Sequence, residues 1–105
     1  MIYVHVRVKP VPGHGWDMLQ TEMAEYNRLI EKDGGKAIGN FVVRIGDGSG
    51  DHIHLFAYED MAAYAAAMEK MGSDPEWQNF LARAGQKVTA VDISVLRPVA
   101  ESALQ

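Results

Sequence analysis

The order in which strand and helix periodicities follow one another constrains this chain more than any other feature. Apolar side chains recur at every second position in four segments, a spacing typical of β-strands. These segments are residues 2–9, 38–45, 51–59 and 88–96. Between them the apolar spacing changes to every third or fourth residue, which is typical of amphipathic helices. The helical segments are residues 16–30, 61–71 and 74–84.

Residues with strong positional preferences agree with these boundaries. Gly34 and Gly35 are expected to end the first helix, because glycine readily adopts the left-handed conformation that follows a helix C-terminus. Asp60 is expected to cap the second helix, and Asp74 the third, with Pro75 at its first helical position. The order β-α-β-β-α-α-β is therefore supported by two independent signals.

This order predicts an α+β fold of the ferredoxin-like type, built as one domain from residues 1–105. The glycine-rich segment 46–50 predicts an antiparallel hairpin between the second and third strands. Right-handed crossovers place the first and third strands at the centre of a four-stranded antiparallel sheet, with the helices on one face.

We expect the more aliphatic face of the sheet to lie under the helices. Its members are Val4, Val6, Val8, Phe41, Val43, Ile45, Ile53, Leu55, Ala57, Val91, Ile93 and Val95. The opposite face then carries Tyr3, His5, Arg7, Asn40, Val42, Arg44, His52, His54, Phe56, Tyr58, Asp92, Ser94 and Leu96. Such a mixture of aromatic, basic and hydrogen-bonding groups suits a small-molecule cavity or a polar subunit interface. We therefore expect a second copy to cover this face in a homodimer.

Composition excludes several classes of function. The net charge of −4 argues against a nucleic-acid partner, which would require a basic surface. No apolar run approaches the roughly 20 residues that span a membrane. The absence of cysteine excludes disulfides and thiolate chemistry. With no basic leader before the first strand, we expect a cytoplasmic protein.

Several segments, in order along the chain, resemble the NIPSNAP-like proteins of the dimeric α/β-barrel superfamily. The most specific are Tyr58-Glu59-Asp60 and the Asp-Pro-Glu-Trp motif at 74–77. The other matching segments are 1–8, 38–46, 54–57 and 96–98. The resemblance implies a ferredoxin-like subunit whose sheet packs against a second copy. It leaves the activity open, because related cavities serve cofactor-free oxidation, cyclisation, isomerisation, dehydration and haem chemistry.

General acid/base catalysis is the leading interpretation of the polar face. Histidine is the commonest proton carrier near neutral pH, and arginine stabilises developing negative charge. The candidate catalytic residues are His5, His52, His54, Tyr58, Arg7 and Arg44. The candidate substrate-binding residues are Tyr3, Asn40, Val42, Phe56, Asp92 and Ser94. This set predicts a cofactor-independent cyclase, isomerase or dehydratase that acts on a small carbonyl-containing or aromatic metabolite.

Two other interpretations remain open. His52 and His54 lie about 6.5–7 Å apart on one face of a strand and, with His5, could hold a metal ion. No nearby glutamate on that face completes a familiar ligand set, because Glu59 points to the opposite side. Alternatively, the polar row lines a wet subunit interface or a non-catalytic binding site.

The first helix adds two further expectations. Trp16 opens its apolar stripe and is expected to anchor the helix against the sheet. Glu22 and Glu25 lie largely off that stripe, so we expect both to be solvated.

Overall fold

A computed structural model describes residues 1–14 and 21–105. The strands are β1 (Ile2–Pro10), β2 (Lys36–Val42), β3 (His52–Tyr58) and β4 (Val88–Leu96). The helices are α2 (Met23–Lys32), α3 (Met61–Ser73), α4 (Pro75–Ala84) and the short 3₁₀ helix η1 (Gly85–Lys87). The predicted start of the first helix, including Trp16, lies outside the described residues.

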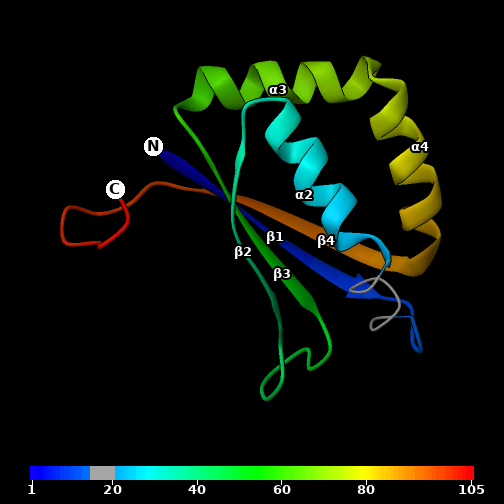
Figure 1. Cartoon of the computed structure of the whole chain (residues 1–105). Helices are drawn as coiled ribbons and strands as arrows, with labels where there is room; N and C mark the ends of the chain where they lie inside the picture. Colours follow the sequence, from blue (N-terminus) through cyan, green and yellow to red (C-terminus); the bar gives the residue numbers. More distant parts are fainter. Residues whose placement is uncertain (15–20) are drawn as a thin grey trace.

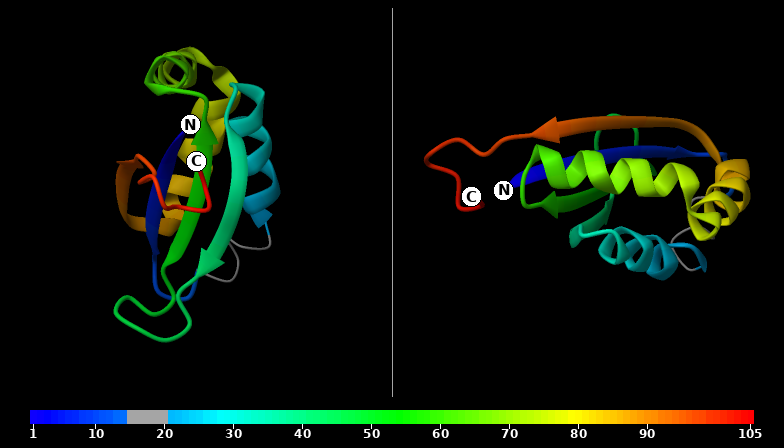
Figure 2. Two further views of the ribbon diagram at one scale, coloured as in Figure 1. Left: turned by 90° about the vertical axis from the view of Figure 1, so that its left-hand side faces the viewer. Right: turned by 90° about the horizontal axis from the view of Figure 1, so that it is seen from above.

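The four strands form one antiparallel sheet in the order β2-β3-β1-β4, and the helices lie on one side of it (Figures 1 and 2). The predicted strand order and the α+β ferredoxin-like class are therefore confirmed. Strands β1 and β3 occupy the centre because each β-α-β connection passes over one strand of the sheet. The connection from β1 to β2 passes over β3, and the connection from β3 to β4 passes over β1.

Side-chain caps define the helix starts that the sequence predicts. The Asp60 carboxylate accepts a hydrogen bond from the backbone N–H of Ala63 at 2.8 Å, and α3 begins at the next residue. The Asp74 carboxylate accepts one from the N–H of Glu76 at 2.9 Å, with Pro75 at the start of α4. Each cap satisfies a backbone donor that would otherwise lack an intrahelical partner.

Strand β2 is shorter than predicted. It ends at Val42, and Ile45, which we expected on the helix-covered face, is 97% exposed in the loop that leads to β3. Gly46, Gly48 and Gly50 have positive φ angles and form the turn that begins directly after Ile45. The alternation of apolar residues in the sequence therefore extends past the end of the strand, over residues 43–45.

Helices α2 and α4 run antiparallel and are tied together near both ends. At the C-terminal end of α2, Lys32 pairs with Asp74 at 2.6 Å, and the indole N–H of Trp77 donates to Asp33 at 2.9 Å. At its N-terminal end, Arg83 pairs with Glu22 at 2.9 Å. The two helices are thereby fixed side by side over the sheet.

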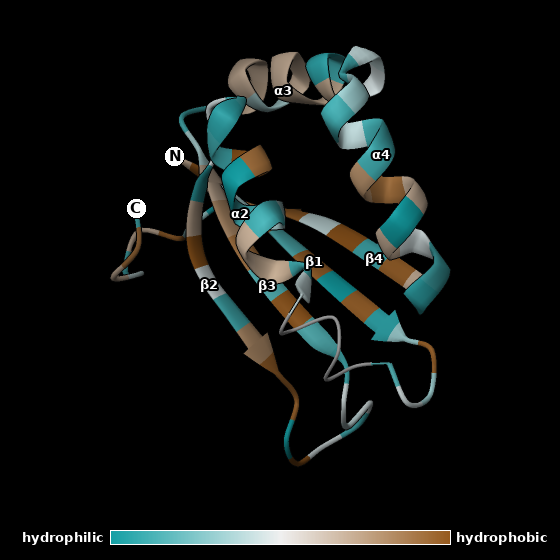
Figure 3. Cartoon of the chain, turned by 45° about the vertical axis from the view of Figure 1, so that its right-hand side comes forward, coloured by the Kyte–Doolittle hydropathy of each residue, from teal (hydrophilic) through white to brown (hydrophobic). Residues whose placement is uncertain are grey.

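The helix-facing side of the sheet agrees with the prediction on β1 and β4. Val4, Val6 and Val8 are buried in the main apolar core with α2 and α4. The β4 side chains opposite them are Val95, Ile93 and Val91. The alternation of apolar and polar residues along these two strands is visible in Figure 3.

On β2 and β3 the prediction is wrong, because the register reverses the expected faces. Val6 lies opposite His54, and directly paired residues project to the same side of a sheet. His52, Phe56 and Tyr58 share that side and are almost fully buried under the helices, whereas Leu55 faces away from them. On β3, Ile53 and Ala57 likewise face away from the helices, and on β2 so does Phe41.

Candidate ligand site between helices and sheet

A cavity of about 250 Å³ lies between helices α2 and α4 and strands β1 and β4. Its lining is mostly apolar, with Val6 and Val8 from β1 and Val88, Val91 and Ile93 from the last strand. Three side chains with ionisable groups also line it: Glu22, Tyr26 and His54. An apolar hollow with a few polar groups is the usual form of a small-molecule site.

Aromatic rings form the wall of the cavity beneath α2. The ring of Tyr26 lies 5.3 Å from that of His54, edge to face, and 6.1 Å from that of Trp77. It stacks on Phe80 with a centroid distance of 5.5 Å. These contacts leave the Tyr26 ring little freedom to move, and burial raises the pKa of its hydroxyl, which stays protonated at neutral pH.

His54 places a neutral imidazole at this wall. Its side chain is 1% exposed, and its pKa falls to about 4, mainly because burial disfavours the charged ring and secondarily because of His52. The two imidazole centroids are 6.1 Å apart. At neutral pH the His54 ring can therefore exchange hydrogen bonds with a ligand without carrying a charge into the cavity.

One edge of the His54 ring is held by a pair of amides. Nδ1 lies 3.0 Å from Nδ2 of Asn40. Asn40 in turn exchanges two hydrogen bonds with Asn27 on α2, at 2.8 and 3.2 Å. Asn40, which was predicted as a binding residue, thus takes part in the site indirectly, through its hydrogen bond to the His54 imidazole.

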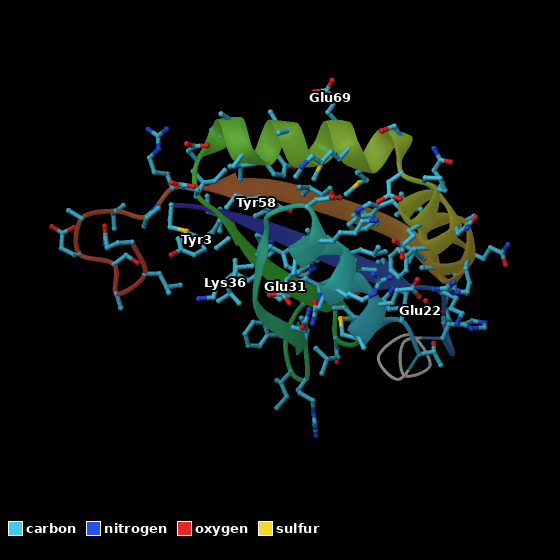
Figure 4. The ribbon with its side chains drawn as sticks, turned by 45° about the horizontal axis from the view of Figure 1, so that its top comes forward. Tyr3, Glu22, Glu31, Lys36, Tyr58 and Glu69 are labelled. Atoms are coloured by element: carbon cyan, nitrogen blue, oxygen red, sulfur yellow. The ribbon has the colours of Figure 1, made fainter. Side chains whose placement is uncertain are left out.

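Glu22 is buried, contrary to the expectation that it is solvated. Glu22 lies at the start of α2 (Figure 4), and its side chain is 5% exposed. Arg83 and Lys87 pair with its carboxylate at 2.9 and 3.3 Å. Hydrogen bonds from Arg83 hold the pKa of Glu22 below its usual range, against the opposing effect of burial. The carboxylate is therefore ionised at neutral pH beside the cavity.

Three other predicted site residues share the helix-facing side. Phe56 packs against Tyr26 at 5.2 Å, and His52 is buried next to His54. Tyr58 packs against Tyr64 on α3 at 5.3 Å, and burial raises its pKa to about 12. These side chains support the cavity wall, but they do not line the cavity. Val42 also projects to this side, opposite His52, and its side chain is exposed.

The remaining predicted residues lie on the other side of the sheet, which we call the open face. His5 pairs with Leu55 in the register, so it projects away from His52 and His54. The three histidines are not brought together, and the metal site that required all of them does not form. Tyr3 is also on the open face, where its hydroxyl donates to the carbonyl of Gln105 at 3.1 Å. The other predicted residues of this face are Ser94 and Asp92.

Neither predicted arginine reaches the cavity. Arg7 pairs with Asp51 at 3.0 Å and donates to the carbonyl of Asp47 at 2.8 Å, which ties the 43–51 loop to β1. A Cβ atom on Gly48 would overlap the Arg7 guanidinium, so this contact requires glycine. Arg44 lies exposed in the same loop. Arg7 therefore has a structural partner on the open face, away from the site.

Sequence reasoning missed Asn27 as a functional residue. It lies four residues after Met23 and three before Ile30, and hence on the apolar stripe of its helix. A polar residue at a stripe position faces the core and needs a buried partner. That signal was present in the helical spacing, but its partner Asn40 could be named only once the faces of β2 were known.

The arrangement of the strands and helices indicates the structural class of this protein. The sheet order and the helices on one face are those of a ferredoxin-like α+β protein. The sequence profile of the NIPSNAP family matches residues 11–103. This chain belongs to the NIPSNAP family.

Solved structures share the fold over the whole chain. An uncharacterized NIPSNAP domain protein from Burkholderia xenovorans is 22% identical, with 97% of this chain and 98% of that one covered and a TM-score of 0.86. Protein Atu4242 from Agrobacterium tumefaciens is 20% identical, with both chains fully covered and a TM-score of 0.89. A NIPSNAP family protein from the same organism, Atu5224, is 24% identical, also with full coverage and a TM-score of 0.86.

Among curated proteins, none matches this chain. In residues 1–14 and 21–105, no helix is both long enough and apolar enough to cross a bilayer. The same residues contain no group of three or more histidine and acidic side chains that could hold a metal ion.

Proposed function

We propose that this protein binds a small, largely apolar metabolite with a carbonyl group in the cavity between α2, α4 and the sheet. The observation that carries the proposal is His54, a buried and uncharged imidazole that lines an otherwise mostly apolar cavity. A hydrogen bond to such a group fixes the orientation of a ligand whose remaining surface is apolar. The volume of about 250 Å³ favours a compact ligand, such as one aromatic ring with a short substituent.

A second candidate, cofactor-independent acid/base catalysis, is favoured by the pairing of two different groups in one cavity. His54 is neutral and Glu22 is ionised at the same pH. Titratable groups held in different charge states within one site are typical of acid/base pairs. In an isomerase of this kind, Glu22 would take a proton from the carbon next to the carbonyl group, while His54 would hydrogen-bond to the developing enolate oxygen.

Acetophenone is a suitable probe for both candidates, because it combines one ring, one carbonyl group and an exchangeable methyl group. We expect it to shift the amide resonances of cavity-lining residues when added to ¹⁵N-labelled protein. In D₂O, loss of its methyl proton signal above the rate in buffer would report proton transfer. Binding without exchange would favour the non-catalytic candidate.

Strand β4 offers a matched pair of variants for this titration. Val91 lines the cavity and is 50% exposed, whereas Val95 lies on the same side of the same strand outside the cavity and is 43% exposed. Val91→Trp should weaken acetophenone binding at least about tenfold by filling the cavity mouth. Val95→Trp should not change it. Equal effects of the two variants would contradict binding in this cavity.

We also propose that a second copy covers the open face in a homodimer. Phe41 is 55% exposed there and Leu96 is 42% exposed, among the half-buried side chains of His5, Ile53 and Leu55. An apolar centre with hydrogen-bonding groups at its margin suits a self-complementary two-fold interface. The ligand cavity is on the opposite side of the sheet, so each subunit would keep its own site.

A further inference from the structure

The hydrogen-bonding character of the cavity depends on which nitrogen of His54 carries the proton. In a neutral imidazole, one ring nitrogen donates a hydrogen bond and the other accepts one. In the described part of the chain, the only hydrogen bond of this ring joins Nδ1 to Asn40. The group that Asn40 presents to Nδ1 therefore determines what Nε2 can offer to a ligand.

The Asn27–Asn40 pair presents an N–H group to the ring. Nδ2 of Asn27 donates to Oδ1 of Asn40 at 2.8 Å, and Nδ2 of Asn40 donates to Oδ1 of Asn27 at 3.2 Å. The Asn40 amide nitrogen has two hydrogens, and its second hydrogen is directed to Nδ1 of His54 at 3.0 Å. An amide nitrogen donates and does not accept, so in this arrangement Nδ1 is the acceptor and Nε2 is the nitrogen left to carry the proton of the neutral ring.

Both members of the pair are held on regular structure. Asn27 is in the middle of α2, and Asn40 is on β2, opposite His54 in the register. The helix and the sheet each fix one amide, and the reciprocal hydrogen bonds fix the two amides against rotation. This arrangement places two half-buried polar side chains at a position where an ordinary core contact would use apolar ones.

We infer that Asn27 and Asn40 are positioning residues that hold His54 in its Nε2–H tautomer, so that the cavity offers an N–H donor and selects ligands with a hydrogen-bond acceptor. The tautomer follows from the protein alone, whereas the selection of ligands rests on the proposed function. A carbonyl oxygen satisfies the donor. A ligand with only an ammonium donor at that end would leave both its own N–H group and the Nε2–H group of His54 without an acceptor.

The tautomer can be measured without any ligand. Long-range ¹H–¹⁵N correlation spectra of ¹⁵N-histidine-labelled protein at pH 7 distinguish protonated from unprotonated ring nitrogens. We expect an unprotonated Nδ1 and a protonated Nε2 for His54, whose signals are identified by their loss in His54→Gln. A protonated Nδ1 would overturn the inference.

Substitution of the amides should move the proton. Asn40→Asp places a carboxylate against Nδ1 and should transfer the proton to that nitrogen or raise the pKa of the ring. Asn27→Ala frees the Asn40 amide to rotate and should give a mixture of the two tautomers. Asn79→Asp on the exposed side of α4 adds the same charge and should leave the His54 spectrum unchanged. An unaltered spectrum in folded Asn40→Asp and Asn27→Ala would contradict a positioning role.

Two probes of nearly the same shape test the selection of ligands. Acetophenone has a carbonyl oxygen where α-methylstyrene has a methylene group. We expect acetophenone to bind at least about tenfold more tightly, and most of this preference to be lost in Asn40→Asp when its His54 ring is neutral with the proton on Nδ1. Equal affinities in the unmodified protein would overturn the selection. Failure of both probes to bind, with Nε2 protonated, would contradict the proposed function and leave the tautomer assignment intact.

Discussion

The two sides of strand β3 differ in a way that their residue types do not suggest. Its polar and aromatic side chains, His52, His54 and Phe56, are the buried ones. Its aliphatic side chains, Ile53 and Leu55, are on the open face and only half buried. Hydrophobicity alone would assign the two sides the other way round.

This difference shows what a small core needs besides apolar area. Rings fill the space beneath α2 with edge-to-face contacts, and each buried polar atom must have a partner. For His54 that partner is Asn40, which is itself paired with Asn27. Aliphatic side chains need no such partner, so they can occupy the open face.

Replacement of the buried ring should produce the largest effect. Phe56→Ala removes a side chain that is 1% exposed and should lower the free energy of unfolding by about 4 kcal/mol. Leu55→Ala, one position away on the open face, should cost about 1 kcal/mol in the monomer. Guanidinium unfolding measures both. A larger loss for Leu55→Ala at low protein concentration would contradict the assignment of the two faces.

Acid should destabilise the protein through the titration of His54, which lies on the helix-facing side of the sheet. The His54 pKa of about 4 lies below the value of about 6.5 expected when unfolded, so the unfolded state binds the proton first. The stability conferred by the neutral ring is fully present above about pH 6.5 and is lost progressively as the pH decreases, and the loss amounts to about 3 kcal/mol by pH 4.

His54→Gln removes this titration, so its free energy of unfolding should depend less on pH than that of the unmodified protein between pH 6.5 and 4. His5→Gln makes the same change on the open face and is the matched control. Parallel pH profiles for the unmodified protein and His54→Gln would show that the imidazole is not held neutral by burial.

Substitutions on the open face should change the association of subunits rather than the folding of each subunit. Leu55→Lys places an ammonium group at the proposed dimer interface and should raise the dimer dissociation constant at least about a hundredfold. Sedimentation velocity over a range of concentrations measures this constant. Ile45→Lys adds the same charge on the exposed loop and should leave it unchanged. A monomeric unmodified protein would remove the proposal that a second copy covers this face.

The local part of the structure could be predicted from the sequence. Asp60 and Asp74 cap helices as expected, and the order of periodicities predicts the strand order. Period two tells which residues of a strand share a side, but not which side lies under the helices. That depends on pairing between distant segments, such as Val6 with His54, and the pattern of either strand alone does not contain it.

The prediction of the candidate site was incomplete for the same reason. His54 and Asn40 were named correctly as neighbours on one face, yet they were grouped with His5 and Arg7 from the other. Glu22 was missed because its burial depends on Arg83, which is 61 residues away in the sequence. A carboxylate on the polar side of a helix gives no local sign that a distant guanidinium will cover it.

The ties between α2 and α4 also bear on how the proposed ligand would reach and leave the cavity. The pairs at Asp33 and Asp74 hold one end of the two helices, and the Glu22–Arg83 pair holds the other. Separation of the helices would break both sets at once, so this route is slow. Val91 and Ile93 line the cavity and are half exposed at the edge of the sheet. Exchange of the proposed ligand across β4 would need only side-chain rotation, so we expect its residence time to be set at that strand.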